Sequence, residues 1–395
     1  MATIVKISLK PGKDEAVRRF HPWIFSGAIN KVYGNIAEGD VVEVYSNRDE
    51  YLATGHYQIG SIAIRIFSFN KENPDINFWK SKLAAAYHLR EVLGLTDNIN
   101  TNVYRLVHAE GDGLPGLIID FYNGTAVIQS HSIGMHYAKP LIVDALKEIY
   151  QDKLNAVYDK SSETLPKMAK IDCNDGYLFG AAATKEVLEN GHAFFVDWEG
   201  GQKTGFFIDQ RDNRKLLSEY AKEKKIVNTF CYSGGFSVYA LKAGAEMVHS
   251  VDSSKKAIEL TEKNLLLGNF NSSQHQSFAE DTMDFLKNTN ETYDIVVLDP
   301  PAYAKHNDAK HNAIQGYKRL NALAMSKINK GGILFTFSCS QVINRQLFNA
   351  TITAAAIESG RQIKILHQLS QPADHPVNIY HPEGEYLKGL VLYID

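Results

Sequence analysis

The chain has 395 residues, of which 44% are hydrophobic and 22% charged, and its formal net charge is −3. This composition is typical of globular proteins and excludes a disordered or fibrous chain, and the length predicts two or three domains. Because the charge is nearly balanced, any basic surface for nucleic acid has to be local. No apolar run approaches the length of a membrane span and the first residues lack the apolar core of a secretory signal, so we expect a cytoplasmic protein with no membrane partner.

Three cysteines, Cys173, Cys231 and Cys339, are spread along the chain. Their number is odd, and the sequence contains neither a CxxC pair nor a His/Cys cluster at zinc spacing. We therefore expect neither a disulfide scaffold nor a metal site.

The first 75 residues predict a small β-rich region. Short apolar runs near 42–44, 52–53 and 62–66 are separated by turn signals, which is typical of strands. Residues 1–30 carry five basic side chains against two acidic ones. Such a local excess occurs on solvated surfaces as well as on phosphate-binding ones. The basic side chains include Lys10, Arg18 and Arg19.

Residues 76–199 predict a central α+β region. Helix-forming residues at helical spacing cover 78–94, and a second helix is expected over 137–150. The dipeptide Asn123-Gly124 predicts a hairpin between neighbouring strands. We expect the strands of this region to be joined by hairpins rather than crossovers. They are expected at 104–107, 117–121, 126–129 and 154–158.

After residue 200, short apolar strands alternate with helices. This alternation predicts right-handed βαβ crossovers and a mostly parallel sheet. The fold class is therefore α/β, with a Rossmann-like C-terminal sheet within residues 200–395. Ligands of such sheets bind outside the carboxyl ends of the strands. The strands are expected at 226–230, 247–251, 295–298 and 333–337.

The first of these strands is followed by adjacent glycines, Gly234 and Gly235. Such a pair lets the chain turn tightly and a ligand approach the backbone at a helix start, but a purely structural turn is the alternative. The pattern is not GxGxxG, which favours a nucleoside-type cofactor over a dinucleotide. Asp252 follows the second strand at the distance of a ribose-binding carboxylate, and Asp281 is a candidate for the adenine amino group. The neighbouring candidates are Phe230, Tyr232 and Ser233.

The segment before this unit combines glycine turns, aromatic residues, amides and arginines, which suits an adenosine-like ligand. A solvated linker that leads into a helix near residue 209 is the alternative. The cofactor candidates from this segment are Phe207, Asp209, Gln210 and Arg211.

The strongest local signal is an apolar strand that ends in Asp299, Pro300 and Pro301. The prolines stiffen the loop, which then either holds a flat base or only ends the strand. Cys339 follows the next strand, where a cysteine is either a small buried hydrophobe or a nucleophile. Because neighbouring strands lie about 4.8 Å apart, we expect Asp299 and Cys339 to face the same crevice as a catalytic pair.

Several motifs together resemble one enzyme family. They are RFHPWIFSGA at 19–28, EGDGLPGL at 110–117, KTGFFIDQR at 203–211, YSGGF at 232–236, DPP at 299–301, FSCS at 337–340 and ADHP at 373–376. In this combination the chain resembles the three-domain bacterial 23S ribosomal RNA cytosine-5 methyltransferases of the large-subunit methyltransferase I type, and the resemblance covers almost the whole chain. It implies a PUA-like RNA-binding domain at 1–75, a central α+β domain at 76–199, and a methyltransferase domain at 200–395 that uses S-adenosylmethionine.

The resemblance also implies a covalent mechanism. The Cys339 thiolate adds to C6 of cytosine while Asp299 binds the N3/N4 edge, and the resulting enamine lets C5 attack the methyl group of the sulfonium. Many RNA cytosine-5 methyltransferases carry a second cysteine after the proline of this motif, whereas Ala302 follows here. The base that removes the C5 proton is therefore unassigned. Cys231 is interpreted as a packing residue.

The implied partner is ribosomal RNA, either naked 23S RNA or a partly assembled large subunit. The target base has to be unstacked into the crevice, where Tyr303 is a candidate for stacking. The sequence leaves the modified nucleotide and the oligomeric state open, and a homodimer is one option. The residues expected at the RNA are Lys10, Arg18, Arg19, Pro300, Pro301 and Tyr303.

Two other functions stay open at this stage. A methyltransferase that acts on an exocyclic amine would share the Asp-Pro-Pro loop but would not need the Cys339 thiol. A non-catalytic RNA-binding or ribosome-assembly module would keep the fold without binding the cofactor.

Overall fold

The computed structural model describes residues 4–167, 171–270, 272–304 and 306–395. The chain divides into two compact units. None of the helices within the described ranges combines the length and the apolar character that crossing a membrane requires. The first unit consists of Met1–Leu188, Val196–Ile208 and Ala373–Gly384, and the second of Glu189–Phe195, Asp209–Pro372 and Glu385–Asp395.

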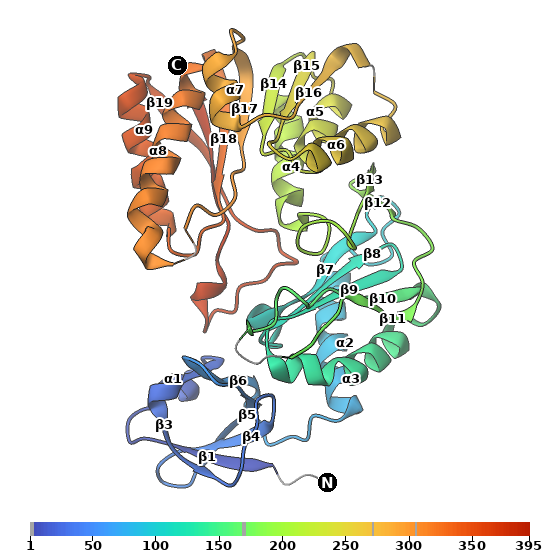
Figure 1. Ribbon diagram of the computed structural model, residues 1–395, viewed down its shortest axis with the longest axis vertical. Coiled ribbons are helices and arrows are strands. Elements are labelled where there is room, and N and C mark those ends of the chain that lie inside the picture. Colours follow the sequence, from blue (N-terminus) through green and yellow to red (C-terminus); the bar gives the residue numbers. More distant parts are fainter. Residues whose placement is uncertain (1–3, 168–170, 271, 305) are drawn as a thin grey trace. The chain divides into compact units, whose positions relative to one another are not determined.

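The first unit begins with a six-stranded sheet in the order β2-β6-β5-β4-β1-β3, drawn in blue in Figure 1. Its core contains Ile7, Val44 and Ile64, all fully buried. The expected β-rich region is confirmed, and strands also form before residue 40, outside the predicted runs. The elements are β1 (Val5–Leu9), α1 (Glu15–Arg18), β2 (Trp23–Phe25), β3 (Ile29–Tyr33), β4 (Val41–Tyr45), β5 (Tyr51–Tyr57) and β6 (Ile62–Ser68).

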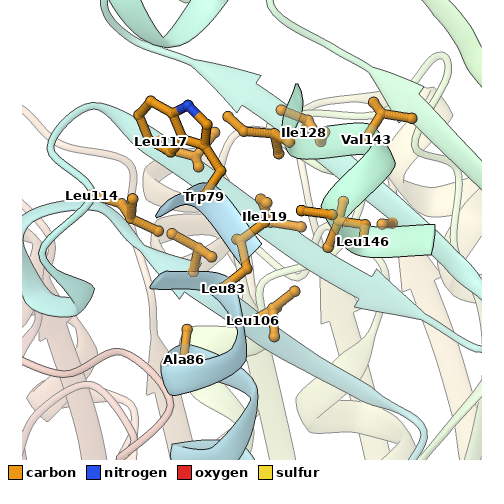
Figure 2. Packing of buried hydrophobic residues seen from close by; sticks show 14 of the residues in the cluster. Trp79, Leu83, Ala86, Leu106, Leu114, Leu117, Ile119, Ile128, Val143 and Leu146 are labelled. Carbon is orange, nitrogen blue, oxygen red and sulfur yellow. The ribbon is translucent and has the colours of Figure 1, made fainter. Parts of the chain in front are cut away.

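A five-stranded sheet in the order β11-β10-β9-β8-β7 follows in the same unit. The helices α2 (Ile76–Val92) and α3 (Ile133–Tyr150) contribute apolar side chains to its core. Figure 2 shows Trp79 and Leu83 of α2 and Leu146 of α3 together with strand residues in this core. The strands are β7 (Val103–His108), β8 (Leu117–Tyr122), β9 (Thr125–Ser130), β10 (Ala156–Asp159) and β11 (Gly176–Gly180), and β12 (Glu186–Glu189) comes next in the chain.

One expected connection of this central region is wrong. β9 and β10 pair in parallel, with Val127 opposite Tyr158, and α3 lies between them in the chain. Parallel neighbours cannot be joined by a tight hairpin, so this connection is a crossover. The hairpin expected at Asn123 is present between β8 and β9, where Tyr122 pairs with Thr125.

The second unit is built on a seven-stranded sheet in the order β16-β15-β14-β17-β18-β20-β19. The first five strands of this order are parallel neighbours, which confirms the Rossmann-like sheet. β20 runs antiparallel to both of its neighbours, an edge that the alternating pattern did not predict. The strands are β14 (Lys225–Thr229), β15 (Met247–Val251), β16 (His275–Phe278), β17 (Tyr293–Leu298), β18 (Ile328–Ser338), β19 (Ile363–Leu369) and β20 (Lys388–Ile394).

Helices of the second unit form two groups. α4, α5 and α6 contact one another in chain order, as do α7, α8 and α9, and Figure 1 shows α8 and α9 side by side. β14 lies between β15 and β17, so the direction of winding reverses there and the loops after these strands are the expected ligand site. The elements are β13 (His192–Phe195), α4 (Arg211–Tyr220), α5 (Gly235–Lys242), α6 (Lys255–Leu267), α7 (Thr282–Asn288), α8 (Lys310–Ser326) and α9 (Arg345–Ser359).

Candidate active site

The loop between β14 and α5 has an unusual backbone. Phe230 has a φ of 55°, Tyr232 a φ of 47° and Gly234 a φ of 74°, all in the left-handed region. For the two bulky residues this conformation costs about 1 to 3 kcal/mol each, and it persists only where the surroundings enforce it. Such strain is concentrated at ligand sites, which fits the expected cofactor loop.

Side chains of α6 hold this loop in place. Thr261 donates a hydrogen bond from its hydroxyl to the Tyr232 carbonyl oxygen at 2.9 Å, and the Asn264 amide donates to the Ser233 carbonyl oxygen at 2.8 Å. A Cβ atom on Gly234 would lie 2.7 Å from Cγ2 of Thr261. The glycine is therefore required both by its φ angle and by the close approach of α6.

Asp252 connects the end of β15 to the same loop. Its Oδ2 accepts a hydrogen bond from the Tyr232 N–H at 3.0 Å, and its Oδ1 accepts one from the Ser254 N–H at 2.9 Å. An ionised carboxylate has about four lone-pair sites, so these two bonds orient Asp252 and leave acceptor capacity for ribose hydroxyls.

Asp281 has a structural role at the start of α7. Its Oδ1 accepts hydrogen bonds from the N–H groups of Met283 at 2.8 Å and Asp284 at 3.2 Å. This is the geometry of a helix N-cap, which satisfies N–H groups that otherwise lack partners. The side chain is exposed, and its contact with adenine stays a prediction.

The four cofactor candidates at 207–211 are divided between the two units. Phe207 belongs to the first unit and Asp209, Gln210 and Arg211 to the second. Gln210 is 3% and Arg211 5% exposed, so these two residues are not solvated, and their contact with an adenosine-like ligand stays a prediction. Asp209 accepts a hydrogen bond from the Tyr386 hydroxyl at 2.7 Å through Oδ2. Its Oδ1 is buried and has no hydrogen-bond partner among the described residues.

Asp299 follows β17 directly and is half-buried. Burial and, next, the nearby Asp209 carboxylate raise the pKa of Asp299 to about 7, and a hydrogen bond from Gln210 and the charge of Arg214 oppose the shift. Close to neutral pH this carboxyl group can therefore both donate and accept a proton.

Cys339 follows β18, the parallel neighbour of β17. Leu298 lies opposite Thr336 in the register, so the two strands end at the same edge of the sheet. Burial, then the charges of Asp299 and Asp209, raise the pKa of the Cys339 thiol to about 11. Cys339 and Asp299, the expected catalytic pair, therefore lie at the same edge of the sheet in the second unit, close enough to interact electrostatically.

Cys231 has a different environment in the cofactor loop. It is 6% exposed, and its Sγ lies 3.6 Å from the Thr261 hydroxyl oxygen. Burial raises the pKa of this thiol to about 12. These surroundings fit the interpretation of Cys231 as a packing residue.

Lys388 is a site residue that the sequence patterns did not reveal. It begins β20 opposite Ser338 of β18, and its Nζ donates a hydrogen bond to the Ser340 carbonyl oxygen at 2.7 Å. The residue is 2% exposed and makes no ion pair among the described residues. Burial lowers the pKa of Lys388 to about 8, opposed by the charge of Cys339. The positive charge of Lys388, which no carboxylate of the described residues neutralises in an ion pair, lowers the pKa of the Cys339 thiol.

A buried ion pair supports the start of α4. Arg214 donates to both carboxylate oxygens of Glu189, at 2.8 and 2.7 Å, and the Tyr239 hydroxyl of α5 donates to the same carboxylate at 3.0 Å. A Cβ atom on Gly235 would lie 2.9 Å from Cδ of Arg214. The second glycine of the motif is therefore also explained by close packing, here against an arginine.

The expected RNA contacts after β17 are unequal. Pro300 is buried and Pro301 is exposed. The Tyr303 ring packs against the Tyr317 ring with centroids 4.7 Å apart and belongs to the margin of the hydrophobic core. Tyr303 therefore has a packing role, and its stacking on a base stays a prediction.

The three basic RNA candidates of the first unit also differ. Arg18 forms ion pairs with Asp14, at 2.7 Å, and with Glu50. Lys10 donates to the Gly27 carbonyl oxygen at 2.9 Å. Arg19 is exposed and has no ion pair among the described residues. Of the three, Arg19 is the cation most available to a phosphate.

Comparison with known proteins assigns the chain to a family. Residues 7–69 match a PUA-like domain, and residues 164–379 match the S-adenosylmethionine-dependent methyltransferases. The ribosomal RNA large subunit methyltransferase I of Aeromonas salmonicida is 39% identical over 98% of this chain and 99% of its own length. The chain belongs to this methyltransferase family. The protein of the same name from Escherichia coli is 36% identical over 98% of both chains.

Solved structures give the same fold. A Streptococcus mutans protein described as a SAM-dependent methyltransferase superposes with a TM-score of 0.84 over 99% of this chain and 100% of its own, at 22% identity. A methyltransferase structure complexed with SAH gives a TM-score of 0.85 over the same shares, at 23% identity. With the family membership, these findings identify the chain as a methyltransferase whose cofactor is S-adenosylmethionine.

Proposed function

We propose that this enzyme methylates C5 of a cytosine in 23S ribosomal RNA through a covalent adduct with Cys339. The observation that carries the proposal is the electrostatic coupling of Cys339 and Asp299 at adjacent strand ends. The curated relatives are named ribosomal RNA large subunit methyltransferases, which supports ribosomal RNA as the substrate. Cytosine-5 chemistry requires a thiol as the nucleophile and, beside it, a carboxyl group whose pKa is close to neutral pH as the proton donor.

The reaction uses both groups in sequence. The Cys339 thiolate adds to C6 while Asp299 donates its proton to N3, so negative charge does not accumulate on the ring. S-adenosylmethionine, when bound, would supply the methyl group that the C5 atom of the enamine takes up. Loss of the C5 proton to a base, cleavage of the C6–S bond and return of the N3 proton to Asp299 then release 5-methylcytosine and the Cys339 thiolate. The pKa of Asp299, raised to about 7, makes it a suitable acid for the first step.

Lys388 supplies the cation that Cys339 needs. With a pKa near 11 the thiol is almost fully protonated at neutral pH, whereas the thiolate is the nucleophile. With its pKa lowered to about 8 by burial, Lys388 is still mostly an ammonium ion at neutral pH. Its positive charge lowers the pKa of the Cys339 thiol and stabilises the thiolate once the thiol has lost its proton.

The cofactor lies along the strand ends in this proposal. The Asp252 carboxylate accepts hydrogen bonds from the ribose hydroxyls, beside a loop whose shape is fixed by α6. Asp281 binds the adenine amino group through the oxygen that does not cap α7. The remaining proposed contacts are Phe207, Asp209, Gln210, Arg211, Phe230, Tyr232, Ser233, Gly234, Gly235 and Asp299.

The proposed division of labour follows three domains, at 1–75, 76–199 and 200–395. The first holds RNA backbone through Arg19, with Lys10 and Arg18 as weaker contributors because they have internal partners. The third receives the unstacked base between Pro301 and Tyr303. The enzyme acts in the cytoplasm, on 23S RNA or on a partly assembled large subunit.

The test measures where the methyl group goes. Purified enzyme, radiolabelled S-adenosylmethionine and 23S RNA from a strain that lacks the gene are incubated, and the RNA is digested to nucleosides. We expect label in 5-methylcytidine. Label in an exocyclic-amine product would contradict cytosine-5 chemistry. Cofactor binding without transfer to naked 23S RNA or to assembly intermediates would contradict 23S RNA as the substrate.

A further inference from the structure

Three potential metal ligands meet in the first unit. His21 lies between α1 and β2, while His381 and Glu383 lie in the segment at 373–384. One ring nitrogen from each histidine and one carboxylate oxygen all lie within 4.8 Å of one another. Oε2 of Glu383 is 3.9 Å from Nε2 of His21 and 3.9 Å from Nε2 of His381.

These distances fit a metal site better than hydrogen bonds. A contact of 3.9 Å is too long for a hydrogen bond. Two ligands that each lie about 2.1 Å from one tetrahedral zinc ion are about 3.4 Å apart. The two separations of 3.9 Å would therefore each shorten by roughly half an ångström on coordination, and the ligand atoms of the two histidines, which lie within 4.8 Å of each other, would also approach.

His381 gives independent evidence for a missing ligand. Its side chain is 4% exposed, and neither Nδ1 nor Nε2 has a hydrogen-bond partner among the described residues. Buried polar groups normally have partners, because an unpaired one loses its water without compensation. The imidazole points one of these nitrogens into the cluster, where a metal ion would accept its lone pair.

The surroundings hold the two rings in position. Nδ1 of His21 lies 3.3 Å from the Trp23 carbonyl oxygen, so in one tautomer Nδ1–H donates to that oxygen and Nε2 presents its lone pair to the cluster. In the other tautomer the same nitrogen accepts from the Trp23 N–H at 3.2 Å. The Trp23 indole packs against His381 with centroids 4.3 Å apart and donates to Glu110 at 2.8 Å.

We propose that His21, His381 and Glu383 bind one zinc ion or a chemically similar divalent transition-metal ion. Two imidazoles and one carboxylate are a ligand set of zinc and related metals, with a fourth position for water. Glu383 is 57% exposed at its side chain, which gives an ion access from solvent. The ion would join the loop before β2 to the segment after residue 373, a structural role that is separate from methyl transfer.

A second cluster of ligands provides the matched control. His136, Asp159 and Cys173 also lie within 4.8 Å of one another. Asp159, however, is ion-paired with the buried Lys139 and accepts a hydrogen bond from Ser161. A metal there would have to displace an ammonium ion, so we assign the metal to the His21 cluster.

The experiment measures zinc binding by the full-length protein. Metal is removed with a chelator, Zn²⁺ is titrated in, and bound zinc is determined by elemental mass spectrometry after gel filtration. We expect one ion per chain and a rise in melting temperature. His381→Gln and Glu383→Gln should each weaken binding about tenfold or more, while His136→Gln should leave it unchanged. Glu383 is exposed, so its variant remains informative if His381→Gln does not fold.

Cobalt substitution distinguishes the two clusters spectroscopically. Co²⁺ bound by His21, His381 and Glu383 should show visible d–d bands and no thiolate-to-cobalt charge-transfer band, because this site has no sulfur ligand. A charge-transfer band that disappears in His136→Gln would assign the metal to Cys173 and overturn the proposal. Absence of stoichiometric binding of either ion, or binding that survives both Glu383→Gln and His21→Gln, would also overturn it.

Discussion

Asp252 and Asp299 occupy similar places in one sheet, each directly after a parallel strand that borders β14, yet their surroundings differ. Asp252 accepts hydrogen bonds from two backbone N–H groups. Asp299 instead meets a buried environment and the Asp209 carboxylate, which raise its pKa to about 7. These surroundings suit the two roles that we propose, with Asp252 as an anchor beside β15 and Asp299 as a proton carrier beside β17.

The contrast extends to the two regions around these residues. On the cofactor side, Thr261 and Asn264 satisfy the carbonyl groups of a strained loop. Around the proposed catalytic pair, Oδ1 of Asp209 has no hydrogen-bond partner among the described residues. Lys388 is buried there and makes no ion pair with a carboxylate of the described residues. Binding a fixed ligand requires satisfied, immobile groups, whereas proton transfer requires groups whose charge is easily changed.

The largest effect should come from the nucleophile on the catalytic side. Cys339→Ala should abolish methyl transfer, because the only other described thiol of the second unit, Cys231, is buried in the cofactor loop and cannot replace it. Cys231→Ala is the matched control and should retain activity. Both variants should bind S-adenosylmethionine, measured by calorimetry. Full methylation by Cys339→Ala would show that Cys339 is not the nucleophile.

Asp299→Asn should lower kcat by about 10² to 10⁴, the range supplied by general acid–base catalysis. Cofactor affinity should change much less, since the substitution keeps the shape of the side chain. Methyl-transfer rates and calorimetry with the same protein preparation check both statements. An equal loss in kcat and in cofactor affinity would make Asp299 a binding residue like Asp252.

The same variant should be stabilised in a pH-dependent way. In wild type the folded carboxyl titrates near pH 7 instead of its usual value near 4, so the folded state holds a proton that the unfolded state has lost. Stability of the wild type therefore falls as pH rises between about 4 and 7. The melting temperature of Asp299→Asn minus that of wild type should grow over this window and then level off. A constant difference would contradict the raised pKa.

Lys388→Met should shift the pH profile of kcat toward higher pH. Without the amine, the Cys339 thiol loses the group that lowers its pKa. The apparent pKa of the rate should therefore rise by about one unit or more, which lowers the rate at neutral pH about tenfold. Lys388→Arg should restore part of the rate, since it keeps the charge. Lys364→Met, in the exposed part of β19, is the control. A lower rate with an unshifted profile would assign Lys388 to packing alone.

Asp252→Ala should weaken S-adenosylmethionine binding by about tenfold or more, since a charge-assisted hydrogen bond contributes about 1.5 to 3 kcal/mol. The exposed Asp284 of α7 gives a control, and Asp284→Ala should bind normally. Calorimetric titration of both variants makes the comparison. Unchanged affinity in a folded Asp252→Ala protein would show that this carboxylate only orders the loop.

The smallest effect should come from the N-terminal cations. Arg19→Ala should reduce the slope of log affinity for RNA against log salt by about 0.7 to 0.9, the value of one phosphate contact. Arg18→Ala should change it less, because Asp14 and Glu50 already neutralise that guanidinium. Equal slopes for wild type and Arg19→Ala would exclude this residue from the RNA surface.

The parallel sheet, and the position of Asp299 and Cys339 at the same edge of it, could be predicted from the sequence. Apolar runs bounded by turn residues mark strands such as β14 and β17, and parallel topology alone brings their carboxyl ends to one edge. The stiff Asp-Pro-Pro turn added a local signal at that edge.

Other features depend on information that an apolar run does not contain. Lys388 reaches the catalytic edge because β20 is antiparallel, and a strand pattern does not reveal its direction. Glu189 and Arg214 pair across 25 positions, and His21 meets His381 from nearly opposite ends of the chain. The crossover between β9 and β10 was missed because an Asn-Gly hairpin next to it suggested continued hairpins.

The central claim is tested most directly with 23S RNA that contains 5-fluorocytidine. After methyl transfer the C5 atom of such a base carries no proton, so the C6–S bond cannot be released and the enzyme stays attached. Mass spectrometry of the digested complex should find a methylated fluorocytidine on the peptide that contains Cys339, and none in Cys339→Ala. An adduct on the Cys231 peptide, or complete turnover of the fluorinated RNA without any adduct, would contradict the account.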